Sequence, residues 1–188
     1  MTGVQTCALP IYTFCCIVLC SCQFKCNLGK TKDAPKENKT TSNPETNKDG
    51  TLVTNNISVT SKGFKVKKAI LLYPDNTPVP DDNTINLNEK IKIALYIDEG
   101  WNLTNGRAFV GAAEKISTDA GVTVAETDDL FAADSRTGFT AEEAELITLS
   151  AIITNAGRGI NYYVVTFRVW DKNGDSEIKG HYNFYLKH

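Results

Sequence analysis

The end of the chain, residues 161–187, contains two runs of alternating apolar and polar side chains on either side of a turn signal. The apolar positions are Tyr163, Val165, Phe167 and Val169 in the first run and Ile178, Gly180, Tyr182, Phe184 and Leu186 in the second. Between the runs lies Asn173-Gly174, and an Asn-Gly pair flanked by alternating runs is the strongest short-range signal for a β-hairpin. The pattern therefore predicts an antiparallel hairpin with one apolar face.

The same pattern predicts the register of the hairpin. A turn closed on Asn173-Gly174 pairs Lys172 with Asp175, and the apolar positions then face one another along the ladder. The expected pairs are Val169 with Ile178, Phe167 with Gly180, Val165 with Tyr182 and Tyr163 with Phe184. A slip by one residue would turn every apolar side chain to the other face. On the polar face this register places Arg168 opposite Lys179, a like-charge pair that should cost a little stability.

The chain before the hairpin reads as more short strands separated by turn signals. With the two hairpin strands there are about eight in all, and the others are expected at residues 52–60, 64–73, 85–97, 107–112, 122–126 and 147–154, with a further piece at 130–133. Thr140 and Glu143 form a capping box that starts one short helix over residues 139–145. Strands with one apolar and one polar face stack as two sheets. We therefore predict an all-β class, with an antiparallel β-sandwich of seven to eight strands and one short helix over residues 51–188.

The sequence Val169-Trp170-Asp171-Lys172-Asn173-Gly174 resembles the last hairpin of immunoglobulin-like bacterial domains of the PKD or cadherin kind, in which V-x-D-x-x-G closes the final turn. The resemblance covers about 25 residues. It implies an immunoglobulin-like sandwich and does not imply a ligand.

The start of the chain does not read as part of the folded domain. Residues 1–11 resemble a translated sequencing adapter, and we interpret them as an assembly artefact. Residues 12–21 are apolar, too short to span a membrane, and of the length of a signal-peptide core. Leu19-Cys20-Ser21-Cys22 resembles a bacterial lipobox, which implies cleavage before Cys22 and acylation of its sulfur. An ordinary secretory signal or another kind of membrane anchor is the alternative.

Residues 22–50 are rich in Lys, Asn, Thr, Pro and Glu and are expected to form a disordered linker. Residues 25–49 contain six lysines and four acids, a net charge of +2, which leaves 14 basic and 18 acidic residues, net −4, for the domain. An acidic domain should not adhere to anionic lipid, so the acyl chains would be the anchor. A nearly neutral whole chain also predicts no nucleic-acid partner.

Few residues suit catalysis or metal binding. All six cysteines lie within the first 26 residues, and the only histidines are His181 and His188. The acid pairs at Asp81-Asp82, Asp128-Asp129 and Glu142-Glu143 read as solvated acids. We therefore expect no enzyme activity and no cofactor. Calcium is the one metal considered, with Asp171, Asn173 and Asp175 as candidate ligands, and the turn explains these residues without an ion.

The outward face of the hairpin carries the residues most suited to binding. They are Tyr162, Arg168, Trp170, His181 and Tyr185. Exposed aromatic side chains among polar groups can form a platform for a sugar or a protein. Ordinary cross-strand pairing on a solvated sheet is the alternative, and a third is that residues 139–154 cover this face.

Together these features predict a lipid-anchored protein of the cell envelope, at the outer membrane or the cell surface. Its sandwich would be a non-catalytic module that engages a protein or a glycan. A carbohydrate-binding accessory domain that uses the aromatic face is the first alternative, and an inert spacer is another. An enzyme built on His181 and the loop carboxylates is the least expected.

Overall fold

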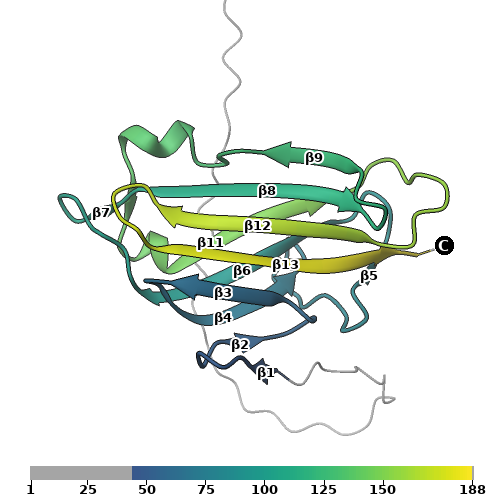
Figure 1. Cartoon of the computed structure of the whole chain (residues 1–188), viewed down its shortest axis with the longest axis horizontal. Coiled ribbons are helices and arrows are strands. Elements are labelled where there is room, and N and C mark those ends of the chain that lie inside the picture. The colour runs from purple at the N-terminus through teal and green to yellow at the C-terminus, as the bar shows by residue number, and fades with distance from the viewer. Residues whose placement is uncertain (1–43, 188) are drawn as a thin grey trace, which may run out of the picture. The chain divides into compact units, whose positions relative to one another are not determined.

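Two β-sheets stacked face to face make up residues 44–187, the part of the chain that this computed structural model describes (Figure 1). The first sheet has the order β1 (Glu45–Thr46), β2 (Leu52–Val53), β4 (Lys65–Leu72), β6 (Lys90–Glu99) and β11 (Leu146–Ile152). The second has the order β3 (Ser58–Lys62), β13 (Glu177–Leu186), β12 (Tyr163–Asp171), β8 (Val110–Thr118) and β9 (Thr123–Thr127), with β5 (Thr84–Ile85) also beside β13. A separate pair joins β7 (Arg107–Ala108) to β10 (Phe139–Thr140). Eight of these strands have five or more residues, which confirms the predicted all-β sandwich.

The order in which the strands alternate between the two sheets differs from that of an immunoglobulin domain. A constant-type immunoglobulin domain places its second and third strands in different sheets, whereas β4 and β6 are antiparallel neighbours within the first sheet. Most pairings are antiparallel, and two short ones, β2 with β4 and β5 with β13, are parallel. The likeness to immunoglobulin domains therefore lies in the layered architecture and the closing hairpin.

The closing hairpin has the predicted register. Eight residue pairs run from Tyr163 opposite Phe184 to Trp170 opposite Glu177. The ladder ends with the Asp171 N–H, which donates to the Ser176 carbonyl at 3.0 Å. The expected pairing of Lys172 with Asp175 is therefore replaced by a four-residue loop, in which the Asn173 N–H donates to Asp171 Oδ1 and the Lys172 N–H donates to the Phe109 carbonyl.

Gly180 lets the two hairpin strands and β3 come close together. A Cβ at Gly180 would collide with the Ser58 carbonyl of β3 and with the Phe167 ring. Phe167 therefore lies over its glycine partner, and this contact explains why a large residue and the smallest one face each other in the predicted register.

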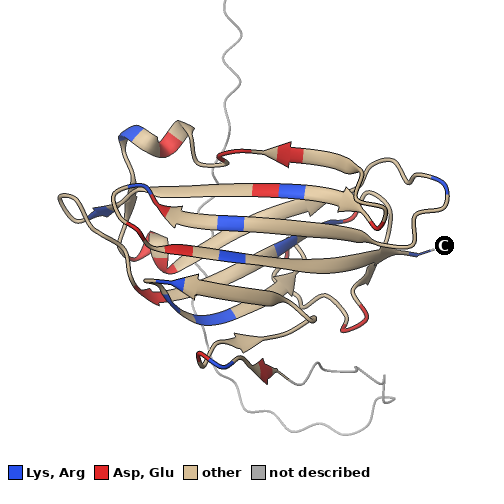
Figure 2. Ribbon diagram, in the orientation of Figure 1, with Lys and Arg blue, Asp and Glu red and all other residues tan. Residues whose placement is uncertain are grey.

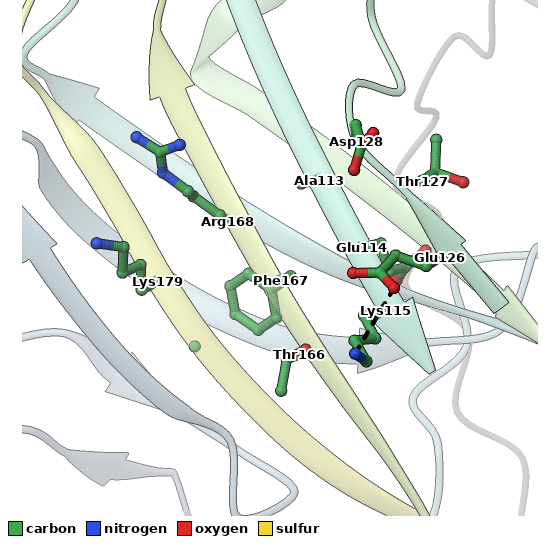
Figure 3. Close-up of a pocket in the computed structure, with 11 residues that line it drawn as sticks. Ala113, Glu114, Lys115, Glu126, Thr127, Asp128, Thr166, Phe167, Arg168 and Lys179 are labelled. Atoms are coloured by element: carbon green, nitrogen blue, oxygen red, sulfur yellow. Dashed lines mark ion pairs between the residues drawn. The ribbon is translucent and has the colours of Figure 1, made fainter. Parts of the chain in front are cut away.

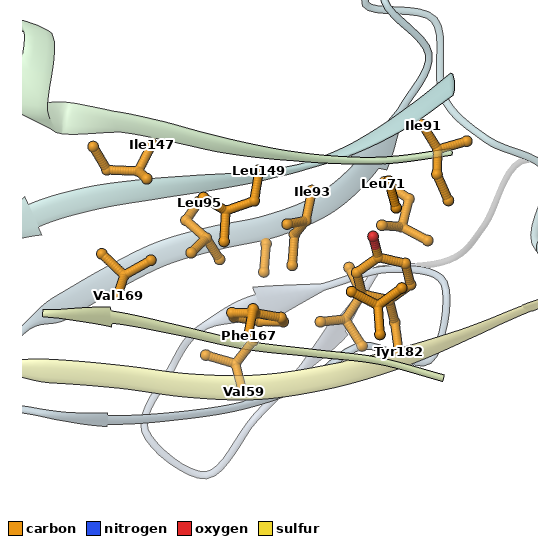
Figure 4. Packing of buried hydrophobic residues seen from close by; sticks show 14 of the residues in the cluster. Val59, Leu71, Ile91, Ile93, Leu95, Ile147, Leu149, Phe167, Val169 and Tyr182 are labelled. Carbon is orange, nitrogen blue, oxygen red and sulfur yellow. The ribbon is translucent and has the colours of Figure 1, made fainter. Parts of the chain in front are cut away.

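The core lies between the two sheets. Figure 4 shows Leu71, Ile93, Leu95 and Leu149 of the first sheet pointing toward Val59, Phe167, Val169 and Tyr182 of the second. The rings of Tyr163 and Phe184 are stacked with centroids 5.4 Å apart. Burying each such side chain contributes about 1.5–3 kcal/mol. Trp101 closes one end of the core, with its ring 4.5 Å from that of Phe64 and its Nε1 donating to the Ala144 carbonyl at 3.1 Å.

The short helix predicted within residues 139–145 is present as a single 3-10 turn. The capping box forms as expected, since the Thr140 N–H donates to Glu143 Oε2 at 2.8 Å and the Glu143 N–H donates to Thr140 Oγ1 at 3.2 Å. Only one 3-10 turn follows, η2 (Glu143–Glu145), because Leu146 is already extended and pairs with β6. The tertiary pairing of β11 overrides the helix signal.

The strand piece expected at residues 130–133 is also absent from the structure. These residues form a turn that leads into a second 3-10 segment, η1 (Ala133–Arg136). Asp129 causes the bend, because its Oδ1 accepts the N–H of Phe131 at 3.0 Å and that of Ala112 at 3.3 Å. A side chain that bonds backbone groups close to it competes with strand pairing.

The first sheet begins earlier than the predicted domain start at Thr51. β1 pairs with β2 across a turn in which the Asn47 N–H donates to the Thr51 carbonyl at 2.9 Å. The end of the predicted linker thus belongs to the sandwich. Residues 1–43, with the adapter-like segment, the apolar run and Cys22, lie outside the described residues. Within residues 44–187 no helix has the length and hydropathy that a membrane-spanning segment needs.

Candidate functional site

Basic residues lie on the three neighbouring strands β8, β12 and β13 (Figure 2). The side chains of Arg168 and Lys179 are exposed on the outward face of the second sheet. The predicted like-charge pair of Arg168 and Lys179 is present in the register. Glu177 lies between them and accepts from Lys179 Nζ at 2.7 Å and from Arg168 Nε at 3.0 Å. These hydrogen bonds, that of Lys179 first, hold the pKa of Glu177 below its usual value. The shared carboxylate therefore offsets the expected repulsion.

A shallow hollow of about 340 Å³, which we call the mid-sheet hollow, lies over these strands (Figure 3). Arg168 and Lys179 border it on one side, and Lys115, Glu126 and Asp128 on the other. Lys115 Nζ is 3.6 Å from Glu126 Oε2. Each of the three cations thus has a carboxylate partner, and exposed pairs of this kind contribute about 1 kcal/mol or less to stability. The mid-sheet hollow reads as a neutralised, solvated sheet surface.

The indole ring of Trp170 packs against residues of its own sheet. The guanidinium of Arg168 lies over the indole, 4.7 Å from the ring centroid. The ring also lies against β8, where a Cβ at Gly111 would collide with it. Two of the five predicted binding residues, Arg168 and Trp170, therefore pack on each other at the turn end of the hairpin.

Of the other three predicted residues, Tyr162 and Tyr185 lie at the opposite end of the hairpin, and His181 lies on β13 between the two ends. The rings of Tyr162 and Tyr185 are 5.9 Å apart at an angle of 56°. Tyr185 is eight residues beyond Glu177, the partner of Trp170, which at about 3.3 Å per residue is roughly 26 Å along the strand. The predicted face is therefore not one continuous platform, and the tyrosine end is the part that remains available.

At the tyrosine end lies a hollow of about 360 Å³, which we call the acidic hollow. Its lining residues are Asn56, Asp81, Asp82, Asn83, His181, Asn183 and Tyr185. The hollow forms where the partner of β13 changes. β3 pairs with β13 only as far as His181, and β5 pairs with it only from Tyr185 onward. The loops before β3 and before β5 meet at this gap.

Two interlocked asparagines form the floor of the acidic hollow. Asn83 is 4 % exposed, and its Nδ2 donates to the carbonyls of Asn55 and Asn183, both at 2.8 Å. In return, Asn55 Nδ2 donates to Asn83 Oδ1 at 2.9 Å. Both residues have a positive φ, 58° and 54°, which asparagine adopts more readily than most side chains. The floor is thus held by buried hydrogen bonds.

The chemistry of the acidic hollow is that of a hydrogen-bond acceptor site beside an aromatic ring. Neither lysine nor arginine is among its described lining residues, so its formal charge comes from Asp81 and Asp82. Asp82 uses one oxygen to accept the Thr84 N–H at 2.9 Å. Across residues 44–187 no three His, Cys, Asp or Glu side chains are grouped so as to hold a metal ion.

Sequence reasoning placed His181 and Tyr185 on the same outward face and missed the residues that complete the hollow. Asp81-Asp82 read as solvated acids, and Asn56 was not singled out. Their position depends on the two-residue parallel pairing of β5 with β13, across about 100 residues of chain. The only local signal is the density of Asn and Asp in the two loops.

The candidate calcium residues organise the hairpin turn. Asp171 is 2 % exposed, and its Oδ2 accepts the Asn102 N–H at 2.6 Å while its Oδ1 accepts the Asn173 N–H at 2.9 Å. Asn173 donates from its side chain to Thr104 Oγ1 at 3.1 Å. Asp175 is exposed. These hydrogen bonds join the turn to the loop after Trp101.

Two buried side-chain polar atoms within residues 44–187, Glu114 Oε1 and Tyr182 Oη, have no hydrogen-bond partner. Glu114 is 8 % exposed and points into the sandwich from β8. Its burial raises its pKa to about 7. Burial, and then the charge of Glu114, raises the pKa of Tyr182. The sequence predicted Tyr182 in the core and gave no sign of a buried glutamate.

No family model matches the chain, and no curated protein matches it. Among solved structures it is similar to the C-terminal domain of wzt, with a TM-score of 0.44 and 12 % sequence identity, over 71 % of this chain and 79 % of that one.

Proposed function

We propose that this protein is a lipid-anchored component of the bacterial cell envelope, and that its sandwich is a non-catalytic module that binds a glycan at the acidic hollow. One observation carries the binding part of the proposal. Tyr185, with Tyr162 beside it, borders a concave site lined by carboxylates and amides on a hydrogen-bonded floor. The alternative, an inert spacer, does not require a concave site with placed polar groups and an aromatic ring.

The side chains of the hollow suit a sugar. A tyrosine ring offers an apolar face to the C–H groups of a pyranose, with a polar tip for hydrogen bonding. Carboxylates accept hydrogen bonds, and the amides of Asn56 and Asn183 can both donate and accept. Binding sites combine apolar surface with a few placed polar groups in this way. A glycan therefore fits the hollow better than the flat contact that a protein partner would need.

Truncating the tyrosine should separate binding from folding. We expect Tyr185→Ala to lower retention on the cognate glycan at least about tenfold, since one aromatic contact supplies roughly 0.5–1.5 kcal/mol beyond the area it buries. The melting temperature should hardly change, because Tyr185 is 40 % exposed. Affinity electrophoresis in gels that contain surface polysaccharide of the producing bacterium measures the retention.

The matched control for Tyr185→Ala is Tyr96→Ala. Tyr96 is a half-buried tyrosine on β6 of the first sheet, with Lys68 Nζ 5.9 Å from its ring centroid. Its replacement should leave retention unchanged. Equal retention by the Tyr185→Ala variant and the parent chain would remove the acidic hollow as the binding site.

An enzyme is the competing function that the same hollow raises, because His181 lines it beside Asp81 and Asp82. A general base needs an orienting partner. Within the described residues His181 makes no side-chain hydrogen bond, which favours binding over turnover. Chromatography of bound glycans after long incubation tests this: intact ligand supports a binding module, and shortened products lost in His181→Ala would establish an enzyme.

The lipid anchor rests on the lipobox-like Leu19-Cys20-Ser21-Cys22, which lies outside the described residues. When the protein is expressed as a secreted precursor in a bacterial host, we expect labelled palmitate to enter the chain and Cys22→Ser to abolish the label. The neighbouring variants Cys20→Ser and Cys26→Ser should keep it, because only Cys22 follows a small residue at the expected distance from Leu19. Label that survives Cys22→Ser would refute this anchor.

A further inference from the structure

A second hollow adjoins the acidic hollow. Its volume is about 510 Å³, and it lies among β1, the turn before β2, the end of β2 and the loop that leads into β3. Asn56 and Asp81 line both hollows. The two concave surfaces therefore meet along these residues and run from Tyr185 to Glu45.

The boundary between the hollows is held in place by the fold. Asn55, next to Asn56, donates from its Nδ2 to the carbonyls of Val79 and Pro80 at 3.1 Å and 3.0 Å, directly before Asp81. Asn56 itself has a φ of 52°. On the far side, Asn47 Nδ2 donates to the Val59 carbonyl at 3.4 Å. These bonds join the two loops, so a ligand that spans both hollows meets a surface that is already formed, which lowers the entropy cost of binding.

The charge along this surface has one sign. Glu45, Asp81 and Asp82 line the two hollows, and no lysine or arginine is among the described residues that line either of them. Carboxylates attract ammonium groups and accept from hydroxyls, while they repel uronate, sulfate and phosphate. A site for an acidic polymer would need the opposite lining.

We propose that the two hollows form a single groove, and that the groove binds an extended oligosaccharide bearing hydroxyl or amino groups and discriminates against acidic glycans. The inference rests on the proposed glycan-binding function and names the ligand class of the same site. Tyr185 stacks on one sugar unit in the acidic hollow. The following units pass Asp81 and reach Glu45 in the adjoining hollow.

Binding of three oligosaccharide series to the full chain, purified in detergent, tests the groove by isothermal titration calorimetry. The series are chitosan oligomers with free amines, their N-acetylated neutral counterparts and oligogalacturonates, each as the dimer and the hexamer. We expect the hexamer to bind at least about tenfold tighter than the dimer in the first two series, because only the hexamer can reach both hollows. The oligogalacturonates should bind more weakly than either.

Asp81→Asn provides the variant, because Asp81 faces both hollows and asparagine preserves its shape. It should weaken binding of the amine-bearing hexamer about three- to tenfold, as expected for the loss of one partly screened charge, and change binding of the neutral hexamer less. Asp175→Asn removes the same charge from the turn at the opposite end of the hairpin and is the control for general attraction between a cationic ligand and an acidic domain. Unchanged melting temperatures show that both variants are folded.

The outcomes separate this inference from the function on which it rests. Equal affinity for dimer and hexamer, a preference for oligogalacturonate, or equal effects of Asp81→Asn and Asp175→Asn would overturn the groove while leaving a glycan-binding module in place. If no series binds and Tyr185→Ala does not alter retention on surface polysaccharide, both the groove and the proposed function fail. Length-dependent binding that falls only with Asp81→Asn supports the groove.

Discussion

Replacing Glu114 by glutamine should remove most of the pH dependence of unfolding between pH 5 and pH 8, and should stabilise the domain by about 2 kcal/mol at pH 8. Glu114 points inward from β8, opposite Phe167, and its Oε1 has no partner within the described residues. A buried carboxylate is costly without a compensating charge or hydrogen bond. Burial therefore raises the pKa of Glu114 from 4.5 to about 7.

The sign of the pH effect follows from that direction. Below pH 4.5 the carboxyl group is neutral in both the folded and the unfolded chain. The difference between its pKa values in the two states then has no effect on the free energy of unfolding. Between pH 4.5 and 7 the unfolded chain ionises first, so stability falls as the pH rises and levels off above pH 7. At about 1.36 kcal/mol per pKa unit the full loss is about 3 kcal/mol. Glutamine removes the ionisation but keeps a buried polar group, so its gain is smaller.

Urea unfolding at pH 5 and pH 8 measures the effect. Glu114→Leu should exceed Glu114→Gln in stability at pH 8, because it also removes the unpartnered polar atom. Glu126→Gln, on the exposed strand β9, is the matched control: it loses the ion pair with Lys115, worth about 1 kcal/mol or less, and should keep the difference in stability that the parent chain shows between pH 5 and pH 8. Parallel pH profiles for the parent and Glu114→Gln would show that another group causes any pH dependence.

The closing hairpin could be predicted residue by residue because its information is local. Two alternating runs around Asn173-Gly174 predict the register, and the eight observed pairs follow it, although a four-residue loop replaces the predicted two-residue turn. The helix signal at Thr140 and Glu143 is just as local, and there the capping box formed but β11 took over the chain at Leu146. The secondary structure of a short element depends on the strands with which it pairs, and these strands cannot be identified from the local sequence.

The candidate site was predictable only in part, for the same reason. His181 and Tyr185 share a face because strand residues alternate. Their separation from Trp170 follows from counting along the strand, but the cover over Trp170 comes from Gly111 and Arg168. Asp81 reaches the site through the short parallel pair of β5 and β13. Glu114 shows the converse case, since a glutamate in an alternating strand is expected on the solvent face.

Replacing Asp171 by alanine should destabilise the domain by about 3 kcal/mol, the largest loss we expect from a single polar side chain. The Asp171 carboxylate is buried and accepts one backbone N–H from Asn173 in its own turn and one from Asn102 in another loop. Hydrogen bonds to charged groups contribute roughly 1.5–3 kcal/mol each, and the two donors would be left unpaired. Asp171→Asn keeps one strong acceptor and should lose about half as much.

Asp175→Ala is the control that separates this role from a calcium site, because Asp175 lies in the same turn and is exposed. If Asp171 acts through backbone N–H groups, Asp175→Ala should cost less than about 0.5 kcal/mol, and thermal melts with calcium or with a chelator should coincide for the parent chain. A bound ion would instead raise the melting temperature with calcium concentration, because a ligand of the folded state stabilises it by mass action. With a bound ion, both Asp171→Ala and Asp175→Ala would lower the stability of the domain. Calcium-dependent melting of the parent chain that disappears in Asp171→Ala and in Asp175→Ala would therefore place an ion at the turn and contradict the hydrogen-bonding role.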